Sequence, residues 1–265
     1  MVDYGLRGKV ALVTGGSMGL GKSVAEVLAR EGVNLAICAR GKEALDAAAA
    51  ELASLGVQTL AVQADMTVPE DIEGLAAVVA QRFGRIDILV NNATSFPVFP
   101  SSEIPVDEAW VYHINVKLLG YVRMSRAVLP YMRPQHWGRI VNVGGIAARL
   151  NLSAPSTAGA TNSAVANFTS GLSNLVAKEG ITVNCVHPGA MRTQRHEMNM
   201  RTAMEEFGIT YEEAERRTIS RIPIGRMLEP EELGHTIAYL CSDFASAITG
   251  QTLAIDGGGT GVPVY

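Results

Sequence analysis

A glycine-rich segment near the N-terminus has the spacing of a phosphate-binding turn. Residues 14–21 read TGGSMGLG and directly follow the short apolar run of residues 9–14. Glycines let the backbone turn sharply and approach a pyrophosphate, whose charge then meets the N-terminus of the following helix. A glycine string alone is a weak signal, but its place between a buried strand and a helix is the context that this chemistry requires. The segment therefore predicts dinucleotide binding, the alternative being a purely structural tight turn.

The end of the second predicted strand bears on the choice of dinucleotide. Residues 34–39 end in Cys38 and Ala39, and Arg40 follows without a neighbouring carboxylate. An acidic residue at this point would accept a hydrogen bond from the ribose 2′-hydroxyl of NAD, whereas a guanidinium pairs with the 2′-phosphate of NADP. Arg40 therefore favours NADP(H), the alternative being a solvated surface charge.

Short β-branched runs alternate with helical stretches along the chain. Strands are predicted at residues 9–14, 34–39, 59–63, 86–90, 139–143, 181–186 and 252–255, and helices at about residues 20–32, 41–56, 69–83, 110–131, 157–178 and 229–242. This alternation indicates right-handed βαβ crossovers and a parallel sheet covered on both faces. We therefore expect one doubly wound α/β domain, a Rossmann fold, over residues 1–265.

One stretch departs from this rhythm. Residues 193–222 are longer and more polar than a simple connection, and helical periodicity surrounds Met198, Met200 and Met204. Ligands of open α/β sheets bind at the carboxyl ends of the strands, where such an insertion would lie as a substrate lid. The alternative is a surface excursion that packs on a neighbouring subunit.

Composition narrows the class of protein. The 265 residues are 48% hydrophobic and carry a formal net charge of −4, so nucleic acid and anionic lipid are not expected as partners. Three cysteines, far apart and without CxxC spacing, predict neither a disulfide framework nor a metal site. The N-terminal residues show no secretory pattern and no apolar stretch is long enough to cross a bilayer, so we expect a cytoplasmic protein.

The chain resembles the short-chain dehydrogenase/reductase family. The spacing TGxxxGxG is that family's glycine motif, and further pieces match in order at Asp65, Asn91-Asn92-Ala93, Asn115, Pro188-Gly189, Gly250-Gln251 and residues 256–258. The resemblance implies that Asp65 bonds the adenine amino group, that Asn92 borders the adenosine ribose, and that Met191 with Thr193 holds the nicotinamide carboxamide. The full expected set for NADP(H) is Gly15, Ser17, Met18, Gly19, Leu20, Arg40, Asp65, Met66, Asn92, Gly189, Met191 and Thr193.

The resemblance fails at the catalytic positions. Relatives use a tyrosine to pass a proton, a lysine to lower its pKa, a serine to orient the substrate and an asparagine to complete a water relay. Here the serine position holds Gly145, the tyrosine position Ala158 and the lysine position Asn162, and no tyrosine lies between Tyr131 and Tyr211. The catalytic candidates that remain are Asn115 and Asn162.

Other side chains are weaker replacements for the missing acid, because each is explained more readily by capping, packing or surface exposure. They are Tyr112, His113, Thr157, Thr161, His187, His196 and Tyr211. We also expect Gly145 and Ala158 to enlarge the pocket beside the nicotinamide, which suits a bulky apolar substrate.

Three functions fit this pattern. The first is an NADP(H)-dependent reductase of a bulky carbonyl or a conjugated C=C, working without the usual tyrosine. The second is a catalytically inactive dinucleotide-binding protein that acts as a sensor or as a partner subunit, and the third is a lyase or hydrolase built in the same pocket. Relatives pair the two long helices, so the resemblance also implies a homo-oligomer, either a dimer or a homotetramer.

Overall fold

A computed structural model describes residues 3–94, 104–150 and 156–261 of the chain. Its strands form one parallel sheet in the order β3-β2-β1-β4-β5-β6-β7. The strands are β1 (Val10–Thr14), β2 (Asn34–Ala39), β3 (Thr59–Gln63), β4 (Ile88–Asn91), β5 (Gly138–Val143), β6 (Ile181–Pro188) and β7 (Thr252–Ile255).

Helices connect and cover these strands. The α-helices are α1 (Gly19–Arg30), α2 (Lys42–Ala53), α3 (Pro69–Phe83), α4 (Asp107–His113), α5 (Gly120–Met132), α6 (Thr157–Val176), α7 (Gln194–Phe207), α8 (Tyr211–Ile219) and α9 (Pro230–Cys241). A π-helical segment, η1 (Ile114–Leu119), joins α4 to α5, and the short 3-10 turns are η2 (Arg133–Gln135), η3 (Ile146–Ala148), η4 (Ala177–Glu179) and η5 (Asp243–Ala245).

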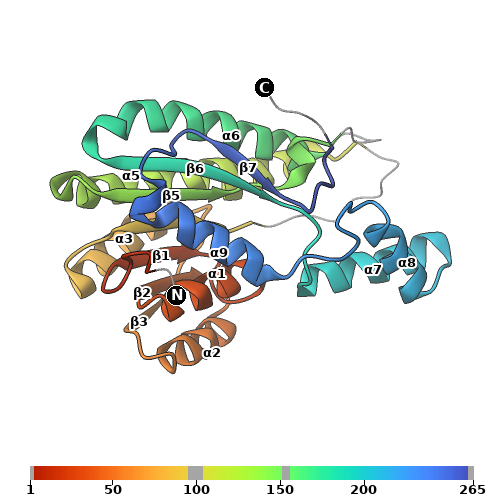
Figure 1. Ribbon diagram of the computed structural model, residues 1–265, viewed down its shortest axis with the longest axis horizontal. Coiled ribbons are helices and arrows are strands. Elements are labelled where there is room, and N and C mark those ends of the chain that lie inside the picture. The colour runs from red at the N-terminus through yellow and green to blue at the C-terminus, as the bar shows by residue number, and fades with distance from the viewer. Residues whose placement is uncertain (1–2, 95–103, 151–155, 262–265) are drawn as a thin grey trace.

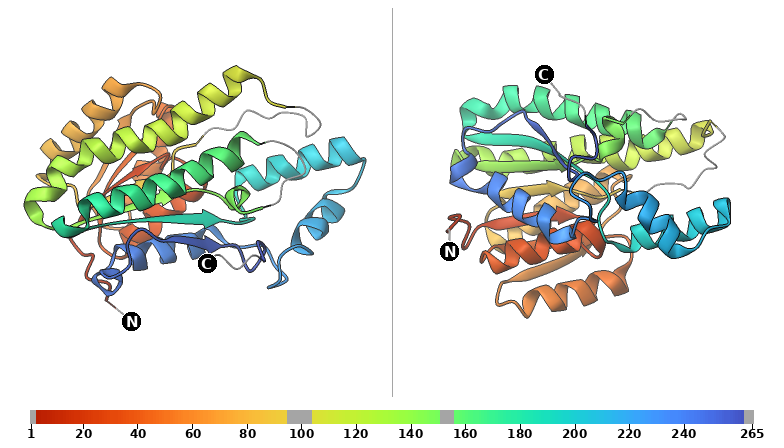
Figure 2. Two further views of the ribbon diagram at one scale, coloured as in Figure 1. Left: turned by 90° about the horizontal axis from the view of Figure 1, so that it is seen from above. Right: turned by 45° about the vertical axis from the view of Figure 1, so that its right-hand side comes forward.

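Hydrophobic side chains on the two faces of the sheet form separate cores. Along β1, Ala11 and Val13 pack with α1, α2 and α9, whereas Val10 and Leu12 pack with α3, α5 and α6. Successive side chains of a strand point to opposite faces, so one buried strand serves both cores. The three layers are seen in Figures 1 and 2. The predicted doubly wound α/β fold is confirmed.

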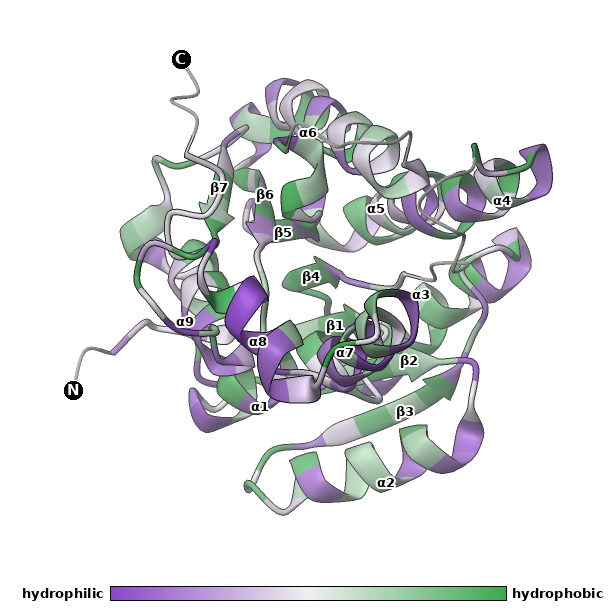
Figure 3. Cartoon of the chain, turned by 90° about the vertical axis from the view of Figure 1, so that its right-hand side faces the viewer, coloured by the Kyte–Doolittle hydropathy of each residue, from purple (hydrophilic) through white to green (hydrophobic). Residues whose placement is uncertain are grey.

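The order of the strands reverses between β1 and β4, which makes the carboxyl ends of these strands the expected ligand crevice. Figure 3 looks onto this edge of the sheet, with α7 and α8 in front of it. These two helices come from the insertion at residues 193–222, whose helical pattern is therefore confirmed. They stand together beyond the end of the sheet in Figure 1.

The long helix expected at residues 110–131 differs from the prediction. It begins at Asp107 and passes through the π-helical segment Ile114–Leu119 before α5. A π turn closes its hydrogen bonds one residue later than an α-helix does, so side chains within and after it are rotated relative to a 3.6-residue pattern. The faces of this helix therefore could not be assigned from periodicity alone.

Within the described residues, no helix is long and apolar enough to span a membrane. The same part of the chain holds no group of three or more His, Cys, Asp or Glu side chains arranged to bind a metal ion.

Candidate active site

The glycine-rich turn between β1 and α1 has a backbone that only glycine adopts easily. Gly15 and Gly19 have φ values of +66° and +55°. A Cβ on Gly21 would lie 2.2 Å from the carbonyl oxygen of Gly15 and 2.4 Å from the amide nitrogen of Asn92. The turn is thus a close backbone cradle with no room for a side chain at Gly21.

Hydrogen bonds fasten this cradle to the neighbouring strand β4. The hydroxyl of Thr14 accepts from the backbone N–H groups of Asn92 and Ala93 at 2.9 and 3.0 Å. The Asn92 side chain donates back to the carbonyl oxygens of Thr14 and Gly15 at 3.0 and 3.2 Å. Asn92, predicted to border a ribose, therefore also holds the glycine turn in position.

A cavity of about 800 Å³ opens above the cradle. It is lined by ten of the predicted cofactor residues, namely Gly15, Ser17, Met18, Gly19, Leu20, Arg40, Asp65, Met66, Asn92 and Thr193. Gly189 and Met191 are not among the lining residues: Met191 is buried and bridges to Leu228, and Gly189 packs against Asp256. The structure therefore brings together the residues expected at the adenosine and pyrophosphate portions of a dinucleotide, and with them Thr193 from the predicted nicotinamide end.

The residues present fit the charged groups of a dinucleotide. No side chain caps the N-terminus of α1 at Met18, and Gly19 and Leu20 of its first turn line the cavity. The N-terminus of a helix offers free N–H groups and a partial positive charge, which suit a pyrophosphate. The cradle leaves space for such a group, because a Cβ on Gly19 would meet nothing within 4 Å.

Arg40 lies at the end of β2 on the wall of the same cavity. Its guanidinium donates from Nη1 to the hydroxyl of Tyr112 at 2.8 Å, and the side chain is otherwise exposed. Gly41, next in sequence, is the uncapped N-terminus of α2 and also lines the cavity. Burial raises the pKa of the Cys38 thiol to about 12, so Cys38 carries no charge here. The end of β2 thus presents positive electrostatic potential without an opposing carboxylate.

Asp65 is held in the opposite wall by its own turn. Its Oδ1 accepts from the backbone N–H and the hydroxyl of Thr67, both at 2.8 Å, and its N–H donates to Asp71. One carboxylate oxygen is thereby fixed by the chain. Among the described residues no hydrogen bond engages Oδ2, so this atom can accept from an amino group.

Helix α7 forms part of the wall of the cavity. Met198, Asn199, Thr202 and Phe207 of this helix line the cavity, as does Arg195. Because the helix belongs to residues 193–222, the predicted lid segment contributes directly to the wall. This wall mixes large apolar groups with one basic residue, Arg195, and one acidic residue, Glu206.

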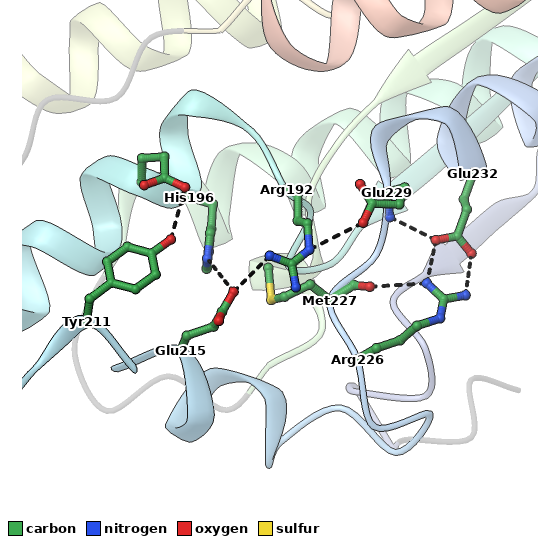
Figure 4. A network of polar contacts seen from close by, with 9 residues as sticks. Arg192, His196, Tyr211, Glu215, Arg226, Met227, Glu229 and Glu232 are labelled. Carbon is green, nitrogen blue, oxygen red and sulfur yellow. Dashed lines mark hydrogen bonds and ion pairs between the residues drawn. The ribbon is translucent and has the colours of Figure 1, made fainter. Parts of the chain in front are cut away.

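A network of polar contacts ties α7 and α8 to the segment before α9 (Figure 4). Arg192 pairs with Glu215 of α8 at 2.9 Å and with Glu229 at 3.3 Å. Arg226 pairs with Glu232, and this hydrogen bond lowers the pKa of that carboxyl to about 2. The insertion is therefore anchored at its base.

Tyr211 and His196, two of the candidate replacements for the tyrosine acid, belong to this network rather than to the cavity wall. The Tyr211 hydroxyl bonds Glu197 at 3.0 Å, and His196 lies 4.0 Å from Glu215 (Figure 4). Neither residue lines the cavity.

The space beside Gly145 is not empty, which corrects the expectation of an enlarged pocket. A Cβ on Gly145 would lie 2.7 Å from Nδ2 of Asn162. The Asn162 side chain is only 2% exposed, and its Oδ1 has no hydrogen-bond partner among the described residues. The structure thus brings Gly145 and Asn162, the predicted serine and lysine positions, together, and the Asn162 amide fills the space beside Gly145. Ala158 is half-buried on the same helix, α6.

Asn115 is directed elsewhere. Its side-chain oxygen accepts from Nη1 of Arg123 at 2.7 Å, and neither Asn115 nor Asn162 lines the cavity.

The π turn that holds Asn115 instead presents Lys117 to the interior, where its Nζ donates to the carbonyl oxygen of Gly144 at 2.9 Å. Lys117 is 1% exposed, and the sequence analysis missed it. The signal was a lysine within the apolar run of residues 116–119.

The remaining candidate replacements for the tyrosine acid are buried or already hydrogen-bonded. His187 accepts from the backbone N–H of Gly145 at 2.9 Å, and burial lowers its pKa to about 4. His113 is fully buried, and burial lowers its pKa to about 4 as well. Thr157 and Thr161 are buried in α6. Both histidines are therefore neutral near pH 7, as the structural interpretation of them expects.

Comparisons with known proteins place this geometry in a family. A family model described as short chain dehydrogenase matches residues 9–204. The 3-oxoacyl-acyl-carrier-protein reductase of Vibrio cholerae is 34% identical over 255 residues, covering 96% of this chain and 98% of the relative.

Two solved structures are similar over almost the whole chain. A variant of actinorhodin polyketide ketoreductase with NADPH superimposes with a TM-score of 0.91 at 33% identity, covering 99% of this chain and all of that one. L-Sorbose reductase from Gluconobacter frateurii, complexed with NADPH and L-sorbose, gives a TM-score of 0.93 at 31% identity and covers 99% and 100% of the two chains. The glycine cradle, the sheet and these matches together show that the chain belongs to the short chain dehydrogenase family.

Proposed function

We propose that the chain is an NADP(H)-dependent oxidoreductase that reduces a bulky carbonyl or a conjugated C=C without the tyrosine acid of its relatives. One observation carries this proposal: a single cavity joins the glycine cradle and Arg40 to the lid helix α7. A cofactor-binding cradle that opens under a lid with apolar walls has a place for a second ligand. The lid supports turnover better than mere cofactor binding.

The cofactor follows from the end of β2. Arg40 and the uncapped N-terminus of α2 favour a 2′-phosphate, and no carboxylate of β2 opposes one. Two similar structures contain NADPH. When bound, NADPH would supply the hydride, and the turn of residues 15–20 together with Arg40 would hold its phosphates.

The substrate class follows from the walls. The apolar lining residues include Met18, Val116, Met198 and Phe207, and the last two are each 60% exposed. Such a wall suits a large apolar molecule. With glycine at 145 and alanine at 158, neither position can donate a proton to the oxygen. A conjugated C=C suits this site because its enolate product is less basic than an alkoxide and takes a proton from a weaker source.

A second function is favoured by one observation, the Asn162 amide that fills the space beside Gly145. This packing would equally suit a protein that binds the dinucleotide as a sensor or as a partner subunit. Turnover separates the two. We expect saturable loss of NADPH absorbance with at least one member of a panel of bulky ketones and enones. Tight NADPH binding without any consumption across the panel would favour the inactive protein.

Assembly is proposed by analogy with the family. Two leucines on these helices are exposed. Leu119 lies just before α5, and Leu175 of α6 is 66% exposed. Pairing of these helices between copies would cover both side chains and give a dimer or a homotetramer. Size-exclusion chromatography with light scattering would show a mass of at least two chains.

A further inference from the structure

The half-buried side chain of Tyr112 reaches the end of β2 from another element of the fold. Tyr112 lies on α4, and its hydroxyl accepts a hydrogen bond from Nη1 of Arg40 at 2.8 Å. This bond joins two residues that are 72 positions apart in the sequence. The hydroxyl is thus bonded to the residue expected to select the cofactor, and Tyr112 is not a replacement for the tyrosine acid.

Tyr112 stands one helical turn before a residue of the cavity wall. Val116, in the π-helical segment that continues α4, lines the cavity together with Arg40, Asp65 and Met66. Asp65 is the residue expected to bond the adenine, so this wall belongs to the adenosine portion of the site. The bond between Arg40 and Tyr112 therefore lies at the part of a dinucleotide site that distinguishes NADPH from NADH, because the two cofactors differ only in the 2′-phosphate of the adenosine ribose.

Arg40 is held both at its backbone and at its guanidinium. Gln63, the last residue of β3, donates from Nε2 to the backbone carbonyl oxygen of Arg40 at 2.7 Å. Tyr112 binds the other end of the same residue. An exposed arginine without such contacts samples many rotamers, and ordering it on a ligand costs free energy. The two bonds lower this cost because they order Arg40 before a ligand binds.

The partner of the guanidinium is a neutral hydroxyl, which suits the binding of an anion. No carboxylate among the described residues pairs with Arg40. A carboxylate at position 112 would neutralise the guanidinium and repel a phosphate, whereas a tyrosine hydroxyl accepts one bond and leaves the charge in place. The guanidinium has further N–H groups beyond the one that Tyr112 binds, and these can donate to phosphate oxygens.

We propose that Tyr112 is a positioning residue for cofactor selection, an inference that rests on the NADP(H) dependence of the proposed function. Its hydroxyl holds the Arg40 guanidinium at the cavity wall, ready for the 2′-phosphate of NADPH. NADH lacks this phosphate, so the bond contributes nothing to its binding. Tyr112 thereby favours one dinucleotide over the other without lining the cavity itself.

Tyr112→Phe tests the inference because it removes the hydroxyl and keeps the ring. We expect the dissociation constant of NADPH to rise by about tenfold, the effect of losing one hydrogen bond to a charged group. The dissociation constant of NADH should stay close to that of wild type. Fluorescence titration measures both without any turnover. Tyr239→Phe, which changes a tyrosine of α9 outside the cavity wall, is the matched control and should leave both constants unchanged.

A double-mutant cycle shows whether Tyr112 acts through Arg40. In the Arg40→Ala background the hydroxyl has no guanidinium to hold, so Tyr112→Phe should cause no further loss of NADPH affinity. Adenosine 2′,5′-bisphosphate and adenosine 5′-monophosphate confine the same measurement to the adenosine portion of the site. Tyr112→Phe should weaken only the bisphosphate, which carries the 2′-phosphate.

The outcomes separate this inference from the proposed function. If wild type binds NADPH no more tightly than NADH, the proposed cofactor dependence fails and takes the inference with it. If wild type prefers NADPH and Tyr112→Phe keeps the full preference, the inference fails and the cofactor proposal stands. Equal weakening of NADPH and NADH would give the hydroxyl a structural role only, and an undiminished loss in the Arg40→Ala background would show that Tyr112 acts independently of Arg40. Either result overturns the inference.

Discussion

The two halves of the carboxyl edge of the sheet are built differently. At β1, β2 and β4 the backbone itself forms the binding surface: a glycine turn with positive φ at Gly15 and Gly19, and two uncapped helix N-termini. At β5 and β6 buried side chains fill the edge, with Lys117 and His187 bonding the backbone of residues 144–145. A site made of backbone tolerates few changes, because glycine is required. A site made of side chains changes its chemistry with a few substitutions.

The same difference underlies the two predictions: one half carries the glycine pattern of a dinucleotide site, and the other is predicted to lack the serine, tyrosine and lysine of its relatives. The cradle has the shape of a phosphate site whatever side chains surround it. The other half has a regular backbone, including the parallel pairing of β5 with β6. Its predicted catalytic positions hold Gly145, Ala158 and Asn162. The predictions below alter one half at a time.

The largest effect is expected from rebuilding the side-chain half. The triple variant Gly145→Ser, Ala158→Tyr and Asn162→Lys places an acid and its supporting lysine beside the cofactor. We expect its rate of simple ketone reduction to exceed that of wild type by about a hundredfold to ten-thousandfold. Steady-state loss of NADPH with a carbonyl panel measures the gain.

The control for the rebuilt site is Gly145→Ser alone. Its Cβ would lie 2.7 Å from the Asn162 amide, so this single change should lower the free energy of unfolding by about 1–3 kcal/mol. Adding Asn162→Ala should return part of that loss, and chemical denaturation of the four members of the cycle measures the coupling. Additive effects would mean that the two side chains do not meet.

A folded triple variant that binds NADPH and gains no activity would show that the pocket differs by more than these three residues.

The backbone half is tested by Gly21→Ala. The new Cβ would lie 2.2 Å from a backbone oxygen that cannot move without reshaping the turn. Overpacking of this kind costs about 1–3 kcal/mol, and we expect NADPH affinity to fall by roughly tenfold to a hundredfold. Fluorescence titration checks it. Gly74→Ala, an α3 position with nothing within 4 Å of the added Cβ, should bind NADPH as wild type does.

The contribution of a single side chain to the backbone half is tested by Arg40→Ala. A partly exposed charge-assisted hydrogen bond is worth about 1.5–3 kcal/mol, so the variant should lose roughly tenfold to a hundredfold in NADPH affinity. NADH affinity should change little. Arg30→Ala, which removes an exposed arginine paired with Glu231 on α9, is the matched control. An unchanged preference for NADPH would make Arg40 a surface charge only.

The sequence predicted the backbone half well because its signal is local. The turn of residues 14–21 lies within one βα unit, and glycine spacing reports directly on backbone shape. The alternation of short strands and helices predicted a parallel sheet, and the predicted bounds of the strands were close to those of the structure.

The side-chain half could not be predicted to the same degree because its contacts are long-range. That the Asn162 amide packs against Gly145, or that Lys117 reaches Gly144, depends on how α6 and η1 pack on β5. In the π turn Lys117, rather than Asn115, faces the interior, and a regular helical period cannot show this. Local motifs therefore identified the positions of the site but not their surroundings.

The central claim is that hydride leaves NADPH for a substrate in a site without a tyrosine acid. Transfer of deuterium from C4-deuterated NADPH tests it most directly, with product analysed by mass spectrometry after incubation of wild type with bulky ketones and enones. The account predicts one deuterium at the reduced carbon of a product. Cofactor that binds tightly and keeps its deuterium with every substrate would contradict it.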